Sequence, residues 1–65
     1  MNWETVEENW EQYKGSTQTK WGKLTDRDLK ESAGKQHKLS LLLQEKYGYS
    51  QQKADMETEK WLSSL

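Results

Sequence analysis

Leu24-Thr25-Asp26-Arg27-Asp28-Leu29 contains the clearest helix start in this sequence of 65 residues. Thr25, followed three residues later by Asp28, has the spacing of a capping box, in which each side chain accepts a hydrogen bond from the backbone N–H of the other residue. Leu24 and Leu29 flank the box at the two positions of a hydrophobic staple. We therefore expect a helix to begin at Thr25.

Two further helices are expected after it. The helix that begins at Thr25 is short, because Gly34 offers a stop after about nine residues. The next helix runs from Lys35 to Tyr47 and ends at Gly48. Its apolar face is formed by Leu39, Leu42, Leu43 and Tyr47. Ser50 caps the last helix, and its inward face is formed by Ala54, Thr58, Trp61, Leu62 and Leu65.

Before the capping box, large side chains recur every three or four residues and predict one long amphipathic helix. They are Trp3, Val6, Trp10, Tyr13, Thr17 and Trp21. Asn2 is positioned to cap the start of this helix, and Gly22 to end it in a left-handed conformation. Gly15 falls inside the helix, where a glycine costs about 1 kcal/mol relative to alanine. Either another helix crosses closely at Gly15, or the helix bends or breaks there.

The composition indicates that aromatic rings form much of the core. Leu and Val together make up only nine of the 65 residues, whereas the chain has four Trp and three Tyr. Each buried aromatic side chain removes roughly 150–250 Å² from water, so these rings can replace much of an aliphatic core. Because the connections between the helices are short, the sequence predicts an all-α fold. We expect a single domain over residues 1–65, a small bundle of about four helices in two helical hairpins.

The length of the chain and its apolar pattern exclude several classes of protein. A chain of 65 residues has little volume for both a core and a deep substrate cavity, so a self-contained enzyme with a small-molecule substrate is not expected. No apolar run approaches the roughly 18 residues of a membrane span, and the start of the chain lacks the pattern of a signal peptide. We expect a cytoplasmic protein without a membrane segment.

Several short motifs, in this order and spacing, resemble the CsbD-like family of small bacterial stress-response proteins. The matching residues extend over nearly the whole chain and are Val6-Glu7, Trp10, Lys14-Gly15, Trp21-Gly22-Lys23-Leu24-Thr25-Asp26-Arg27-Asp28-Leu29, Ala33-Gly34-Lys35, Leu39, Gln44-Glu45-Lys46-Tyr47-Gly48 and Trp61. The resemblance implies two orthogonally packed helical hairpins, similar to SAM-domain-like folds, and expression raised under general stress. It implies no catalytic residue and no cofactor. The chain departs from the family pattern at Glu8, where Gly is usual, and at Thr17 and Thr58, where apolar residues are usual.

Leu41, Leu42 and Met56 are the candidate residues for binding a partner. The resemblance implies Gly at the position of Leu41 and Lys at that of Leu42. Leu41 lies about 160° around its helix from Leu39, and Met56 points away from the inward face of the last helix. Either these side chains fill a gap left by a different helix crossing, or they form an exposed apolar patch that binds a protein partner or a second copy of the chain.

Seven basic residues are the candidates for binding anions: Lys14, Lys20, Lys23, Arg27, Lys30, Lys35 and Lys38. Residues 14–38 hold these seven bases against three acids, whereas residues 1–13 hold four acids and no base. Either the acidic segment neutralises the basic one, or the bases form a weak anion-binding face. The net charge of −1 argues against a dedicated nucleic-acid binder. Ala33-Gly34-Lys35 is the nearest approach to a phosphate-binding loop, although an ordinary turn is the simpler interpretation.

No residue is expected to be catalytic or to bind a metal. The single histidine, His37, lies among Lys35, Gln36 and Lys38, a pattern typical of a solvated helix start. A metal site would need several ligands that converge on one point. The acids of residues 1–13 are instead spaced along one expected helix, with no His or Cys among them. We expect a non-enzymatic stress-response protein that acts by binding or protection. The alternatives are a weak nucleic-acid or polyanion binder that uses residues 14–38, and a largely disordered protectant.

Overall fold

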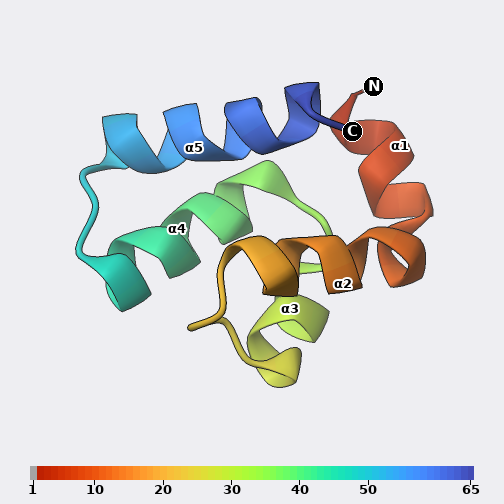
Figure 1. Cartoon of the computed structure of the whole chain (residues 1–65), viewed down its shortest axis with the longest axis horizontal. Helices are drawn as coiled ribbons and strands as arrows, with labels where there is room; N and C mark the ends of the chain where they lie inside the picture. The colour runs from red at the N-terminus through yellow and green to blue at the C-terminus, as the bar shows by residue number, and fades with distance from the viewer. Residues whose placement is uncertain (1) are drawn as a thin grey trace.

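A computed structural model describes residues 2–65 and contains five helices with no strand in that range (Figure 1). The helices are α1 (Trp3–Glu8), α2 (Trp10–Lys20), α3 (Asp26–Ser32), α4 (Gln36–Tyr47) and α5 (Gln51–Ser63). The predicted all-α bundle is confirmed. It has five helices, where about four were expected, because the first predicted helix is divided into α1 and α2.

Asn9 makes this division. Its backbone lies at φ −117° and ψ 32°, so the residue ends α1 and begins α2. The Asn9 backbone N–H and the side-chain Nδ2 both donate to the Thr5 carbonyl, at 3.1 and 3.0 Å. The backbone bond is the regular helical one, and the side-chain amide competes with it for the same carbonyl. The interpretation of Gly15 was therefore wrong, since Gly15 lies inside α2 and a Cβ built there would meet nothing within 4 Å.

The predicted helix start at Thr25 is confirmed. The Asp28 N–H donates to Thr25 Oγ1 at 3.1 Å, and the Thr25 N–H donates to Asp28 Oδ2 at 3.2 Å, which completes the capping box. Leu24 and Leu29, the predicted staple pair, are both buried. The helix ends two residues before Gly34, because Ala33 already has a left-handed backbone at φ 52°.

The turn between α3 and α4 packs against the junction of α1 and α2. A Cβ on Gly34, whose φ is 79°, would lie 3.0 Å from Trp10 Cε3 and 3.2 Å from Glu7 Cα. The Trp10 indole N–H donates to the Leu29 carbonyl at 2.8 Å in the same region. The contact fixes α3 relative to α2, and it requires both the left-handed backbone and the missing side chain of glycine.

Most of the other predicted helix ends are confirmed. The side chains of Asn2 and Ser50 accept hydrogen bonds from Thr5 N–H and Lys53 N–H, and Gly48 ends α4 at φ 68°. Gly22 was expected to be left-handed, and this is wrong. The chain leaves α2 through Trp21 at φ −121° and ψ 81°, a conformation open to any L-residue.

Helices α4 and α5 form an antiparallel hairpin across which polar side chains pair (Figure 1). Ser40 Oγ donates to Asp55 Oδ1 and Gln36 Nε2 donates to Glu59 Oε1, both at 2.7 Å. On the other side, α2 approaches α5 through the rings around Trp61. The Trp61 ring centroid lies 5.7 Å from that of Trp3, 6.4 Å from that of Tyr13 and 6.2 Å from that of Trp21.

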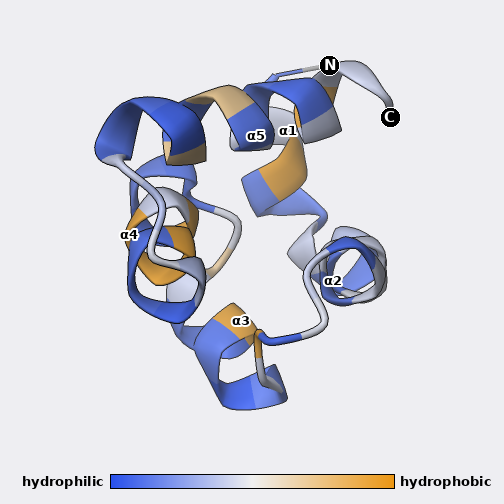
Figure 2. Cartoon of the chain, turned by 60° about the vertical axis from the view of Figure 1, so that its left-hand side comes forward, coloured by the Kyte–Doolittle hydropathy of each residue, from blue (hydrophilic) through white to orange (hydrophobic). Residues whose placement is uncertain are grey.

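The core combines these rings with a few aliphatic side chains, as the composition predicted. Its buried members are Val6, Trp10, Trp21, Leu24, Leu29, Leu39, Leu43, Ala54, Trp61 and Leu62. Figure 2 shows that strongly hydrophobic segments are short in every helix and nearly absent from α2, whose buried residues are Trp10 and Thr17. Leu65 was expected to face inward and is 40% exposed, because it lies beyond the end of α5.

The buried threonines Thr17 and Thr58 satisfy their own hydroxyl groups. Each hydroxyl donates to the carbonyl three residues earlier, at 2.7 Å to Lys14 and 2.8 Å to Asp55. Both side chains are fully buried. The core therefore accepts threonine without leaving these hydroxyl groups unsatisfied.

Candidate functional site

The candidate partner residues lie in two different places. Leu41 is 46% exposed and Met56 is 49% exposed, so neither side chain fills a gap in the core. Leu42 is partly buried and packs against the core. Leu41 and Leu42 line a groove between α3 and α4, whereas Met56 stands on α5 at the border of two other hollows. The expected exposed apolar surface is present at Leu41, with Leu42 forming its inner wall.

The groove between α3 and α4 has a volume of about 240 Å³. Its lining residues are Asp28, Glu31 and Ser32 from α3 and Lys38, Leu41, Leu42 and Glu45 from α4. Three carboxylates and one ammonium group thus line the same groove as an exposed leucine. Such a mixture of an apolar floor with a charged rim is typical of surfaces that bind other molecules.

The three carboxylates of the groove differ in how strongly they are held. Asp28 caps α3 and lies 3.6 Å from Lys46 Nζ. The backbone N–H of Thr25, helped by the charge of Lys46, holds the pKa of the Asp28 carboxyl below its ordinary value of 3.8. Glu31 makes only an exposed ion pair with Arg27 at 3.4 Å, and such surface pairs exchange easily. Glu31 and Glu45 are therefore the carboxylates that a partner can reach.

The seven candidate anion-binding residues differ in their partners. Lys14, Arg27 and Lys35 pair with carboxylates of Glu11, Glu31 and Glu7, at 3.7, 3.4 and 3.1 Å. Lys20 and Lys23 lie over the rings of Trp21 and Tyr47. Lys30 and Lys38 appear in no ion pair of residues 2–65. Two acids of the first segment thus neutralise bases of the second, as one of the two interpretations expected.

The Ala33-Gly34-Lys35 segment is an ordinary turn and not an open phosphate loop. The Lys35 N–H donates to the Ser32 carbonyl at 3.0 Å, and Gly34 is buried against the Trp10 ring. The Lys35 ammonium group binds Glu7. Since the amide, the glycine and the charge are all engaged, this turn does not provide a cradle for phosphate.

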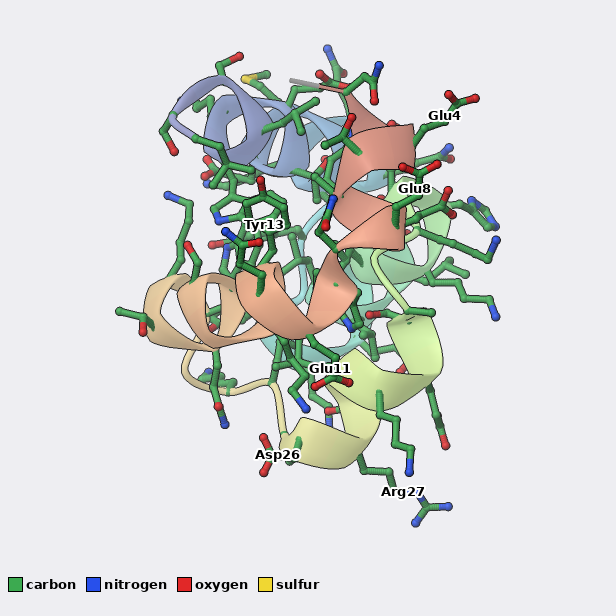
Figure 3. The ribbon with its side chains drawn as sticks, turned by 90° about the vertical axis from the view of Figure 1, so that its right-hand side faces the viewer. Glu4, Glu8, Glu11, Tyr13, Asp26 and Arg27 are labelled. Atoms are coloured by element: carbon green, nitrogen blue, oxygen red, sulfur yellow. The ribbon has the colours of Figure 1, made fainter. Side chains whose placement is uncertain are left out.

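Three acidic side chains of the first two helices point into solvent. Glu4 and Glu8 from α1 and Glu11 from α2 extend outward, while Tyr13 points from α2 toward α5 (Figure 3).

Across residues 2–65, no three His, Asp or Glu side chains come together in a way that could hold a metal ion. Within the same range, no helix is long and apolar enough to cross a membrane.

A further group of side chains was not identified from the sequence. The rings of Tyr47 and Tyr49 stack with centroids 5.4 Å apart and planes at 28°. Lys23 Nζ lies 5.0 Å from the centre of the Tyr47 ring, and Lys53 Nζ lies 4.9 Å from that of Tyr49. The sequence Tyr47-Gly48-Tyr49 could have indicated this stacking. A left-handed Gly48 reverses the chain, so that the two tyrosine side chains turn toward each other.

Comparison with known proteins finds clear relatives for the whole chain. A family model described as CsbD-like matches residues 4–55. The UPF0337 protein RPA4217 of Rhodopseudomonas palustris is 43% identical over 65 residues, which are 100% of this chain and 98% of that protein. The UPF0337 protein YjbJ of Escherichia coli K12 is 41% identical over 61 residues, 94% of this chain and 88% of that protein. No solved structure matches, so the likeness to SAM-domain folds stays a prediction.

Proposed function

The chain belongs to the CsbD-like family, and on that premise we propose that it is a non-enzymatic, stress-associated domain that acts in the cytoplasm by binding another protein. The family is associated with stress. The single observation that supports a binding role is the open groove between α3 and α4, which the exposed Leu41 helps to line.

The side chains that could act as acids or bases have structural roles, and this supports a function without catalysis. Asp28 caps α3, while Asp55 and Glu59 accept hydrogen bonds that join α4 to α5. His37 is exposed at a hollow that Asp55 and Glu59 also line, and both of these carboxylates already have donors. A general base or a nucleophile needs a side chain whose hydrogen bonds serve the reaction, whereas these groups serve the fold.

The charges of the groove define the partner that it would bind. Asp28 and Glu31 already pair with Lys46 and Arg27, the pair of Glu31 being exposed. Glu45 lines the groove and appears in no ion pair of residues 2–65, so it is the carboxylate most open to a base of a partner. A segment that places an apolar side chain on Leu41, with lysine or arginine beside it, matches both the floor and the rim. We expect such a segment to come from another protein, and to be held weakly because the groove is small.

Selection from a random peptide library tests this function, with the whole chain as bait. We expect the enriched peptides to share an apolar residue next to lysine or arginine, and to bind Leu41→Lys at least about tenfold more weakly than the wild type. Met56→Lys is the matched control, since Met56 is equally exposed and lies outside the groove. The proposal would be contradicted if the library gave no enriched peptides, or if the enriched peptides were acidic. It would also be contradicted if the peptides bound Leu41→Lys as tightly as the wild type.

A further inference from the structure

The stacked tyrosines and their two lysines form a layered array at the ends of α4 and α5. The order of the layers is Lys23, Tyr47, Tyr49 and Lys53, with 5.0, 5.4 and 4.9 Å between neighbouring groups. Lys23 comes from the connection between α2 and α3, so three separate segments of the chain contribute. This array is a different surface from the groove at Leu41.

Hydrogen bonds from backbone N–H groups to side-chain hydroxyl groups hold the array in place. The Lys23 N–H donates to Tyr47 Oη at 3.2 Å, which ties the connection after α2 to the end of α4. Gly48, at φ 68°, reverses the chain between the two tyrosines. The Lys53 N–H donates to Ser50 Oγ at 3.1 Å, which fixes the first turn of α5. Both rings are partly buried and pack against the core, so part of each ring stays open to solvent.

The two lysines differ from most other bases of the chain in their partners. Lys14, Arg27, Lys35, Lys46 and Lys60 each lie within 4.0 Å of a carboxylate oxygen. Lys23 and Lys53 are exposed and appear in none of the ion pairs of residues 2–65. A ring face stabilises an exposed ammonium group by only about 0.5–1 kcal/mol, so an anion can draw these lysines away from the rings.

Proteins bind single-stranded nucleic acid with cations that hold the phosphates and with aromatic rings on which the bases stack. We propose that Lys23, Tyr47, Tyr49 and Lys53 form a binding site for single-stranded nucleic acid. The ammonium groups move onto neighbouring phosphates, and a base takes the outer ring face that Lys53 leaves on Tyr49. A duplex binds less well, because its bases are already stacked on each other.

This site revises the anion-binding alternative derived from residues 14–38. Of its seven bases, only Lys23 belongs to the array, and Lys53 lies far outside that segment. The proposal does not depend on the peptide groove. Loss of peptide binding in Leu41→Lys and loss of oligonucleotide binding in array variants are separate results.

Fluorescence anisotropy with a labelled oligothymidylate of about 12 nucleotides tests the site, at about 20 mM salt, where phosphate contacts are strong. A blunt DNA duplex and inorganic polyphosphate serve as competing ligands. We expect the double variant Lys23→Gln/Lys53→Gln to weaken binding of both the oligonucleotide and polyphosphate. We expect Tyr49→Leu to weaken oligonucleotide binding about tenfold and polyphosphate binding hardly at all, and Tyr49→Phe to restore it.

The matched control is Lys30→Gln/Lys38→Gln, which removes the same charge from two lysines outside the array and outside every ion pair of residues 2–65. Circular dichroism of each variant checks that the fold is kept. Four results would overturn the proposal: no oligonucleotide binding up to about 1 mM protein, equal affinity for the duplex, an unchanged affinity in Tyr49→Leu, or an equal loss in the control variant.

Discussion

Replacing Gly34 with alanine should destabilise the domain strongly, whereas the same change at Gly15 should stabilise it. At Gly34 an added Cβ would lie 3.0 Å from the Trp10 ring and 3.2 Å from the Glu7 Cα. The ring cannot move away easily, because its N–H is bonded to the Leu29 carbonyl and Trp10 is only 8% exposed. The backbone must also keep a φ of 79°, which costs an alanine about 1–2 kcal/mol.

The steric overlap and the backbone strain together should lower the free energy of unfolding by about 2–4 kcal/mol. For a domain of this size each kcal/mol shifts the melting temperature by roughly 4–8 °C, so we expect a decrease of at least about 8 °C. Gly15 lies inside α2 with nothing within 4 Å, so Gly15→Ala should raise stability by about 0.5–1 kcal/mol.

Urea unfolding followed by tryptophan fluorescence and far-UV circular dichroism measures both variants. The two glycines differ in their surroundings and not in chemistry, so each variant is a control for the other. A loss below about 0.5 kcal/mol for Gly34→Ala, or a loss for Gly15→Ala equal to it, would refute the packing of the α3–α4 turn on Trp10. A wild-type chain with no cooperative transition would favour the disordered-protectant alternative.

Three other outcomes are expected from the same measurements. Trp10→Ala should cost about 3–5 kcal/mol, because it removes a buried ring and leaves the Leu29 carbonyl with one donor fewer; a loss under about 1 kcal/mol would contradict this. Leu41→Lys should change stability by less than about 0.5 kcal/mol, and a loss above roughly 2 kcal/mol would show that Leu41 is buried. The lowered pKa of Asp28 means that its contribution is present above its ordinary value of 3.8 and is lost as the pH falls through the lower folded value. Asp28→Asn should therefore destabilise the domain more at pH 7 than at about pH 2, and an equal effect at both would be inconsistent with that shift.

Local signals in the sequence predicted several helix ends, and long-range contacts explain the rest. The capping box at Thr25 and the left-handed Gly48 involve only neighbouring residues, so their patterns are sufficient. The break at Asn9 could not be seen in the periodicity, because Val6 and Trp10 stay on the buried side across it. Ala33 takes the left-handed position that a glycine was expected to take, where the turn packs on Trp10.

The candidate site was only partly predictable for the same reason. The exposure of Leu41 follows from its angle around one helix, which the sequence contains. The groove needs α3 beside α4, and the array needs Lys23 beside Tyr47, 24 residues away. Both depend on how the helices pack, and spacing within one segment carries no information about that.

The Leu29 carbonyl oxygen accepts three donors: the Ala33 N–H at 3.1 Å, the Ser32 hydroxyl at 2.8 Å and the Trp10 indole N–H at 2.8 Å. Because the acceptor belongs to the backbone, an apolar exchange that keeps the volume of the buried Leu29 side chain leaves these hydrogen bonds in place. Fraying of the last turn of α3 also releases the indole. In hydrogen–deuterium exchange, the Ala33 amide and the Trp10 indole proton should therefore report the same opening event.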